Sequence, residues 1–325
     1  MTAPSAVSSD ILRLDPVRET ARIVQQIRRA IFVDLKRKGA VIGVSGGIDS
    51  SVVAALCARA VGPDRVLAIF TPERDSSPDS LRLGRLLANH LAIPSVLEDI
   101  TPALEFVRCY HRRDEFVREA VPEYGPGYKC KIVLPNLVDE DRYALFSVVV
   151  QSPDGVIRRT RLSAGASMGI VAATNFKQRV RKMMEYYHAD RLQYAVAGTP
   201  NRLEYDLGFF VKNGDGSADL KPIAHLYKSQ VYQLAEHLGV PAEISNRRPT
   251  TDTYPLDQSQ EEFYFSLPLE KMDLCLYGWN HGLPPASLVD ATGLDTARVQ
   301  RVYRIIESRR RSSHYLHAAP VLVEP

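Results

Sequence analysis

The stretch Val41-Ile42-Gly43-Val44-Ser45-Gly46-Gly47-Ile48-Asp49-Ser50-Ser51 predicts a buried strand that runs through a glycine turn into a helix. Its first four residues are typical of a parallel strand, and the apolar-periodic run from Val52 to Val61 predicts the helix. The turn exposes backbone N–H groups at a helix N-terminus, where phosphate binds favourably. Asp49 adds a carboxylate that would repel a bare anion, so we expect a divalent cation to join it to the phosphates.

Neither of the common nucleotide-binding signatures is present at this turn. No lysine follows Gly47, as the pattern G-x-x-x-x-G-K-[ST] requires, and the pattern G-x-G-x-x-G is also absent. The segment Ser45–Ser50 instead resembles the pyrophosphate loop of the ATP pyrophosphatases, which adenylate a substrate and release pyrophosphate.

Composition is ordinary for a globular protein and excludes several classes. The 325 residues are 45% hydrophobic and 24% charged, and the net charge of +3 is too small to indicate a nucleic-acid or membrane partner. No apolar run approaches the ~20 residues that span a bilayer, and Met1–Asp10 lacks the features of a signal peptide. The four cysteines are scattered without a C-x-x-C pattern. We therefore expect a cytoplasmic protein.

Strands alternate with helices over much of the chain. Val66–Phe70, Ser95–Ile100 and Gln193–Ala197 predict further strands, separated by helical stripes. This alternation predicts an α/β fold with a doubly wound parallel sheet and flanking helices. Ligands of such sheets lie beyond the carboxyl ends of the strands, where the 45–51 turn and Glu204 are expected.

The alternation of strands and helices breaks at three places, which predicts the domain organisation. We expect residues 1–14 to form a flexible N-terminal arm, residues 15–265 the main domain, and residues 266–325 a helical C-terminal extension. Within the main domain, residues 109–168 predict a β-rich insertion, because turn clusters separate short apolar runs there. Its role is open between a lid, a dimer contact and a substrate wall.

Several spaced segments together resemble the NAD synthetases, and the similarity covers most of residues 15–110 and 169–265. The glycine- and carboxylate-rich stretch Gly208–Leu220 is its most specific part. The segments that carry the resemblance are Ser45–Ser51, Asn175–Tyr187, Gly198–Glu204, Gly208–Leu220, Lys228 and Pro249–Asp252. The resemblance implies an adenine nucleotide alpha hydrolase-like sheet. It also implies that ATP adenylates the carboxylate of nicotinic acid adenine dinucleotide (deamido-NAD), after which ammonia displaces AMP.

The family resemblance also implies roles for individual residues. Mg²⁺ would be held by Asp49 and Glu204. ATP would be bound by Ser45, Gly46, Gly47, Asp49, Ser50, Ser51, Thr199, Lys228 and Thr250. Deamido-NAD would be bound by Arg179, Arg181, Tyr186, Lys212 and Asp219. Such enzymes are homodimers, with the dinucleotide near the subunit interface.

The chemistry of the reaction agrees with these roles. Transfer of AMP builds negative charge on phosphate, which a lysine such as Lys228, loop amides and a metal held by Asp49 can stabilise. Ammonia must be neutral to attack, and we hypothesise that Asp215 takes a proton from ammonium. The predicted catalytic residues are therefore Asp49, Lys228 and Asp215.

The insertion lies where part of the dinucleotide pocket is expected, so two alternatives stay open. One is an amide synthase of the same family that acts on a different carboxylate. The other is a non-catalytic module that binds adenine nucleotides. The residues before Ser45 are too few for an amidohydrolase domain, so we expect free ammonia, or ammonia from a separate protein, as the nitrogen source.

Overall fold

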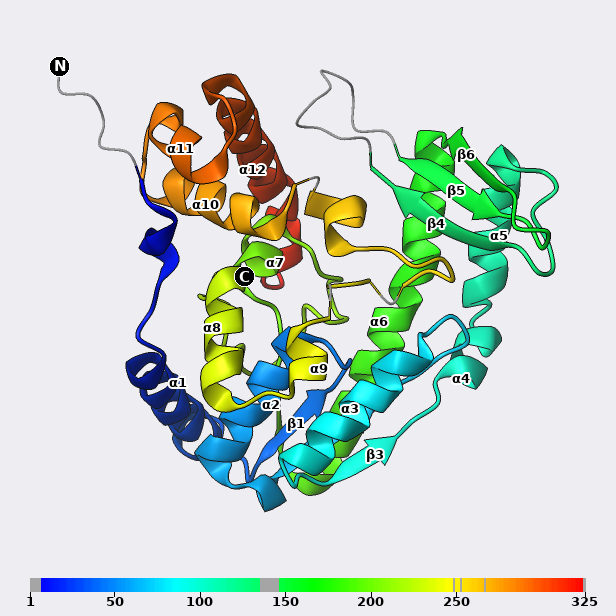
Figure 1. Cartoon of the computed structure of the whole chain (residues 1–325). Helices are drawn as coiled ribbons and strands as arrows, with labels where there is room; N and C mark the ends of the chain where they lie inside the picture. Colours follow the sequence, from blue (N-terminus) through cyan, green and yellow to red (C-terminus); the bar gives the residue numbers. More distant parts are fainter. Residues whose placement is uncertain (1–6, 135–145, 248, 252, 266, 324–325) are drawn as a thin grey trace.

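A computed structural model describes residues 7–134, 146–247, 249–251, 253–265 and 267–323. It contains a parallel sheet with helices on both faces, a smaller antiparallel sheet, and a helical region formed by the last part of the chain (Figure 1). None of the helices in the described ranges combines the length and the apolar character that crossing a bilayer requires.

The parallel sheet confirms the predicted fold class. Its strand order is β3-β2-β1-β7, and Ala40 of the central strand pairs with both Val66 and Ala195. Ala40 begins an almost fully buried strand, as the apolar pattern predicts. The strands are β1 (Ala40–Gly43), β2 (Val66–Phe70), β3 (Ser95–Leu97) and β7 (Ala195–Val196).

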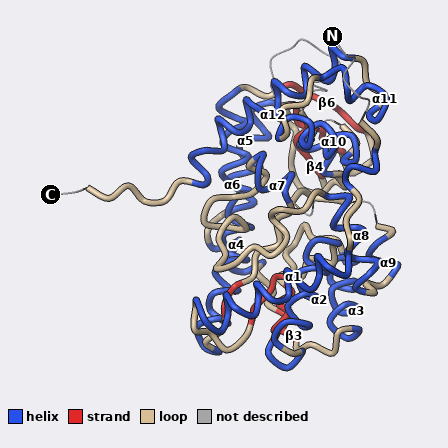
Figure 2. The backbone as a smooth tube through the Cα atoms, turned by 90° about the vertical axis from the view of Figure 1, so that its left-hand side faces the viewer, coloured by secondary structure: helices blue, strands red, loops and turns tan. Residues whose placement is uncertain are grey.

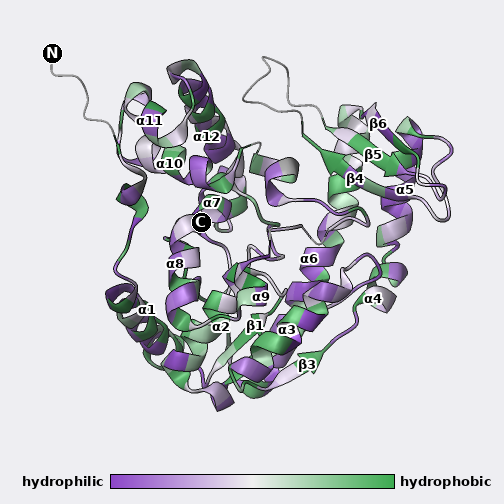
Figure 3. Cartoon of the chain, viewed as in Figure 1, coloured by the Kyte–Doolittle hydropathy of each residue, from purple (hydrophilic) through white to green (hydrophobic). Residues whose placement is uncertain are grey.

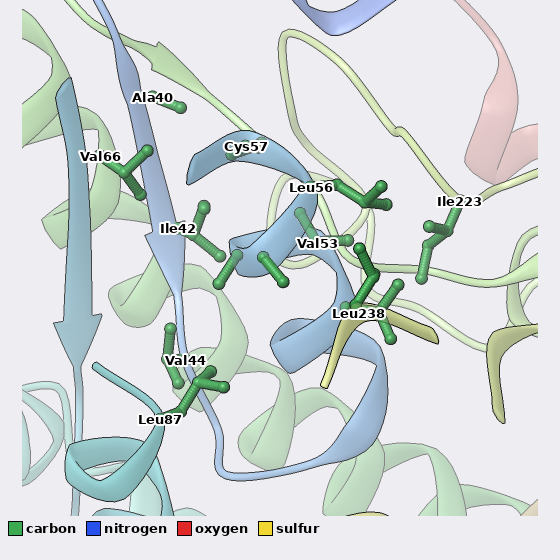
Figure 4. Close-up of a cluster of buried hydrophobic side chains, with 14 of the residues drawn as sticks. Ala40, Ile42, Val44, Val53, Leu56, Cys57, Val66, Leu87, Ile223 and Leu238 are labelled. Carbon is green, nitrogen blue, oxygen red and sulfur yellow. The ribbon is translucent and has the colours of Figure 1, made fainter. Parts of the chain in front are cut away.

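Helices cover both faces of this sheet. On one face, Ile42 of β1 packs among Val53 and Leu56, with Ile223 and Leu238 closing the same cluster (Figure 4). On the other face, Val41 packs against the long helix α6, because successive strand residues point to opposite sides of the sheet. The helices around the sheet are α1 (Pro16–Arg29), α2 (Ile48–Val61), α3 (Pro78–His90), α4 (Thr101–Phe106), α6 (Ala164–Leu192), α8 (Lys228–Leu238) and α9 (Ala242–Ser245).

The second sheet is antiparallel, in the order β4-β5-β6, and lies within the predicted insertion. The interval 109–168 is less β-rich than expected, because it begins with helix α5 and ends inside α6. In α5 the residues Cys109, Tyr110, Arg113 and Val117 form one buried stripe at helical spacing. The elements are α5 (Cys109–Ala120), β4 (Lys129–Val133), β5 (Ser147–Gln151) and β6 (Ile157–Arg161).

The C-terminal helices form a separate apolar cluster that also includes the short helix α7 (Arg202–Leu207). Leu12 is buried in this cluster, and Val7 N donates to the Ser287 carbonyl over 3.1 Å. Residues 7–14 are therefore packed, in contrast to the flexible arm that the sequence predicts (Figure 1). The helices are α10 (Leu269–Asn280), α11 (Val289–Thr292) and α12 (Thr296–His317).

Hydropathy follows these layers. Figure 3 shows mainly hydrophobic residues along α2 and β1, whereas α12 carries long hydrophilic stretches on the outside of the molecule.

Figure 2 shows the chain after α12 leaving the body of the protein as an extended segment. Its residues Val321, Leu322 and Val323 are exposed.

Candidate active site

A cavity of about 450 Å³ lies at the carboxyl ends of β1, β2 and β7. This is the edge of the parallel sheet where the sequence predicts ligand binding. Predicted site residues from distant parts of the chain meet in its wall. They are Ser45, Gly47, Asp49, Ser50, Arg181, Thr199, Glu204, Asp215, Lys228 and Thr250.

The turn between β1 and α2 is held by its own serines. Ser50 Oγ donates to the Gly47 carbonyl over 3.0 Å, and Ser51 Oγ donates to the same oxygen over 2.8 Å. Ser45 Oγ accepts from Gly47 N over 3.3 Å. Ser51 and Gly46 do not line the cavity, so within this structure they shape the turn.

Gly46 shows why the turn needs glycine. Its φ of +74° lies in the left-handed region, and a Cβ at this position would lie 2.5 Å from the Ser80 carbonyl oxygen. The turn therefore lies directly against the first turn of α3.

A carboxylate and a lysine face each other beside the turn. Lys228 Nζ, from the first residue of α8, pairs with Asp49 Oδ2. Asn201 Nδ2 donates to the other oxygen, Asp49 Oδ1, over 3.0 Å. Burial acts to lower the pKa of Lys228, but the charges of Asp49 and Glu204 outweigh it and raise this pKa, so the lysine is a stable cation.

Glu204 is the second partly buried carboxylate at this place. Its oxygens accept from Asn201 N over 3.2 Å and from Gln260 Nε2 over 3.0 Å. Burial and then the charge of Asp49 raise the pKa of Glu204 to about 8. Ionising both carboxylates is therefore costly unless further positive charge is present.

A charged wall from α6 lies across the cavity. Lys182 Nζ donates to Glu185 Oε2 over 2.5 Å, and both side chains are buried. A Cβ on Gly43 would lie 2.6 Å from Glu185 Oε1, so the end of β1 requires glycine to pass this pair. Asp215 accepts from Val211 N over 2.7 Å, and burial raises its pKa.

The other residues predicted for the dinucleotide lie outside the cavity lining. Tyr186 O–H donates to Asp219 Oδ1 over 3.4 Å, while Asp219 Oδ2 accepts from Val196 N over 2.7 Å. Arg179 Nε donates to the Lys212 carbonyl over 3.3 Å. Lys212 Nζ donates to the carbonyls of Tyr315 and Ala318 at the end of α12. Their assignment to deamido-NAD stays a prediction.

Three residues that the sequence analysis does not name contribute to the site. Asn201 forms a capping box with the predicted Glu204 at the start of α7, and the spacing N-x-x-E signals such a box in the sequence. Gln260 and Arg247 carry no such local signal, because segments far apart in the chain bring them to the cavity.

A buried ionic cluster lies behind the cavity and was also not predicted. Lys177 Nζ donates to Glu73 Oε1, Asp75 Oδ2 and the Thr253 carbonyl over 2.9, 2.8 and 2.8 Å. Arg113 Nη1 donates to Asp75 Oδ2 over 2.6 Å. Burial would raise the pKa of Asp75, but the charges of Lys177 and Arg113 outweigh it and lower this pKa to about 2.

Comparisons with known proteins agree on one family. The profile of the family described as NAD synthase matches residues 19–121 and 153–318. The NH(3)-dependent NAD(+) synthetase of Mesorhizobium japonicum is 57% identical over 312 residues, which cover 96% of this chain and 98% of that protein.

Two solved structures share the fold at lower sequence identity. The NMN synthetase of Francisella tularensis has a TM-score of 0.65 and 22% identity, covering 95% of this chain and 99% of that one. The NH3-dependent NAD synthetase of Campylobacter jejuni, in complex with the nitrate ion, has a TM-score of 0.62 and 20% identity, with coverages of 96% and 100%.

Proposed function

Because the chain belongs to the NAD synthase family, we propose that it amidates deamido-NAD with ammonia and ATP. The reaction passes through an acyl-adenylate and gives NAD, AMP and pyrophosphate. The protein is thus a ligase that forms a carbon–nitrogen amide bond.

One observation supports this reaction most directly. The Lys228–Asp49 pair and the Glu204 carboxylate meet at the Ser-Gly-Gly turn, inside a cavity large enough for organic substrates. A site that only binds a nucleotide has no need of two neighbouring, partly buried carboxylates, since their repulsion weakens anion binding. Their presence favours chemistry on phosphate.

The turn and the lysine would act on the phosphates. The amides at the start of α2 point along the helix dipole, which favours negative charge. Lys228 carries a full positive charge into the same place. The carboxylate of deamido-NAD attacks the α-phosphate, and the bond to pyrophosphate breaks. The amides and Lys228 would stabilise the negative charge that develops on the phosphate oxygens in this step.

The residues present fit a magnesium ion. Mg²⁺ is usually held by one or two carboxylates together with phosphate oxygens and water, and Asp49 and Glu204 supply the carboxylates. Gln260 Oε1 is buried near them without a hydrogen-bond partner among the described residues. No cluster of three or more metal-binding side chains occurs in the described ranges, so substrate oxygens would complete the shell. When bound, the ion would neutralise phosphate charge.

The second half-reaction needs neutral ammonia. Asp215 lines the cavity, and burial raises the pKa of its carboxyl, which makes it a better proton acceptor than an exposed aspartate. We assign to it the removal of a proton from bound ammonium. Arg181 lies on the same wall and would hold the dinucleotide.

We also propose that the protein is a homodimer in the cytoplasm. Phe106 on α4 and Met183 and Tyr187 on α6 are 89%, 55% and 59% exposed, and α4 packs on α6. We place the contact between subunits at these exposed apolar side chains, because exposed apolar surface often marks such contacts. The cysteines of the described residues are free and buried, as is usual in a reducing compartment.

The function is tested by incubating the purified protein with ATP, Mg²⁺, ammonium and deamido-NAD and separating the products. We expect NAD, AMP and pyrophosphate in equal amounts. Parallel reactions replace deamido-NAD with nicotinic acid mononucleotide and ammonium with glutamine. Turnover of the mononucleotide alone would favour the alternative carboxylate, and nucleotide binding without AMP release would favour a binding module.

The assembly is tested by the molar mass in solution. Light scattering after gel filtration should give twice the mass of one chain, and Phe106→Glu together with Tyr187→Glu should shift the protein toward monomer. A wild-type protein that is monomeric at micromolar concentration would exclude the dimer.

A further inference from the structure

We infer that Arg247 binds the pyrophosphate half of ATP and holds the pyrophosphate as it leaves. This role deepens the proposed function and rests on it. Arg247 lies outside the 45–51 turn, and no motif of the sequence analysis includes it.

The cavity offers few cations that are available to an anion. Arg181, Lys182, Lys228 and Arg247 line it, but Lys182 is paired with Glu185 and Lys228 with Asp49. Within the described parts of the chain, no carboxylate pairs with Arg247. The guanidinium is therefore a positive charge that faces the cavity without compensation, which favours an anionic ligand.

The position of Arg247 relates it to the turn that binds phosphate. Its Nη1 donates to Ser80 Oγ over 3.5 Å. The same Ser80 lies against Gly46, whose Cβ position would be 2.5 Å from the Ser80 carbonyl. Arg247 thus lies on the α3 side of the turn, whereas Lys228, from α8, pairs with Asp49 in the first turn of α2. A diphosphate bound at the turn would be held between the two cations.

The backbone around Arg247 fixes where the side chain begins. Arg247 N donates to the Ile244 carbonyl over 3.2 Å, and Ile244 is 1% exposed within the main apolar cluster. Helix α9 is thereby anchored, while Arg247 itself is only partly buried. The backbone of Arg247 is therefore held in place while its long side chain can change conformation. The guanidinium can then stay in contact with the phosphate groups when bound ATP is converted to pyrophosphate.

Serines complete the surroundings of this charge. Ser76, Ser77 and Ser80 line the cavity at the beginning of α3, which starts at Pro78. Hydroxyl groups at a helix N-terminus add donors beside the guanidinium. Arginine binds phosphate through a planar fork of donors, so two oxygens of one phosphate can be held together.

The chain offers a matched control in Arg82. This residue is also an arginine between α3 and α9, since it pairs with Asp79 and with Glu243 over 3.1 and 2.7 Å. It does not line the cavity. If Arg247 only joined these two elements, removal of Arg82 would have the same effect as removal of Arg247.

The test compares Arg247→Gln, Arg247→Lys and Arg82→Gln with the wild type. Initial rates of NAD formation give KM for ATP and the inhibition constant of pyrophosphate, and calorimetry gives the Kd of magnesium pyrophosphate without turnover. For Arg247→Gln we expect each of these constants to rise roughly tenfold, as for the loss of a charge-assisted hydrogen bond. KM for deamido-NAD should stay unchanged. Arg247→Lys should recover part of the loss, and Arg82→Gln should match the wild type.

Two results would overturn the inference: pyrophosphate constants of Arg247→Gln equal to those of the wild type, or an equal shift in Arg82→Gln. A wild type that binds pyrophosphate but forms no NAD would instead contradict the proposed function. The calorimetric comparison then still decides the role of Arg247.

Discussion

Asn201 Nδ2 donates a hydrogen bond to Asp49 Oδ1 over 3.0 Å, although the two residues are 152 positions apart in the chain. Asn201 Oδ1 accepts at the same time from Glu204 N over 3.2 Å. One side chain therefore caps α7 and orients the carboxylate at the start of α2. Both carboxylates assigned to magnesium depend on it, because the backbone N–H of Asn201 also donates to Glu204.

The double role of Asn201 can be separated by substitution. Serine is also a good N-cap, so Asn201→Ser should keep α7 but lose the contact with Asp49. Residues that orient metal ligands typically change affinity or activity by 10–100-fold. We expect Asn201→Ser to raise the Mg²⁺ concentration at half-maximal rate by roughly tenfold, while the Tm stays close to that of the wild type.

Asn201→Ala is the companion variant, since it loses both contacts. It should show the same change in Mg²⁺ dependence and also a loss of roughly 1 kcal/mol in the free energy of unfolding. A Mg²⁺ titration of Asn201→Ser identical to that of the wild type would show that the contact with Asp49 has no part in the reaction.

Gly46 and Gly62 allow a comparison of strain with steric conflict. Both have positive φ, +74° and +90°, but a Cβ on Gly62 would meet nothing within 4 Å. We expect Gly62→Ala to cost roughly 1–2 kcal/mol of stability through backbone strain alone and to keep KM for ATP. Gly46→Ala should in addition displace α3 and raise KM for ATP by more than an order of magnitude. Equal KM values in both variants would contradict the close approach of the turn to α3.

Glu204→Gln should separate activity from stability. The variant removes one of two neighbouring, partly buried carboxylates that repel each other, so the metal-free protein should unfold at a Tm no lower than that of the wild type. The capping box tolerates glutamine. The rate of NAD formation should nevertheless fall by at least roughly tenfold because a metal ligand is lost. Activity retained at low Mg²⁺ would argue against this assignment of Glu204.

Asp75 predicts how stability depends on pH. Its pKa is about 2 in the folded protein, against a usual value of 3.8. A carboxyl with a lowered folded pKa contributes stability that is complete above the unfolded pKa and is lost as pH falls from about 4 to about 2. This difference corresponds to about 2 kcal/mol. Urea unfolding at pH 7 and at pH 3 should therefore show a smaller pH effect for Asp75→Asn than for the wild type.

At pH 7, Asp75→Asn should also lower the free energy of unfolding by roughly 3 kcal/mol, because Lys177 and Arg113 keep their buried charges without this partner. Asp34→Asn is the matched control. Asp34 pairs with Arg29 over 3.6 Å on the surface, where an ion pair contributes at most about 1 kcal/mol. An equal loss of unfolding free energy in both variants would show that the buried cluster stabilises the protein no more than a surface ion pair does.

Local features of the fold could be predicted from the sequence. The 41–51 stretch holds its strand, turn and helix in continuous order. Asp15 caps α1 by accepting from Val17 N and Arg18 N, and its place directly before Pro16 is a local feature of the sequence. Apolar periodicity also located β2 and most of α3. The elements that were misjudged, α5 and residues 7–14, are stabilised by partners far away in the chain.

The sequence by itself determined which residues form the parallel sheet and the phosphate turn, because periodicity and turn chemistry act between near neighbours. Only the tertiary structure decided that Arg247 reaches Ser80, that Lys177 is enclosed by Glu73 and Asp75, and that Leu12 is buried beneath the C-terminal helices. These contacts join segments of about 100 residues or more apart. These contacts form only when the helices pack against the sheet and charged side chains become buried beside distant partners. A local sequence pattern predicts neither the packing nor the burial.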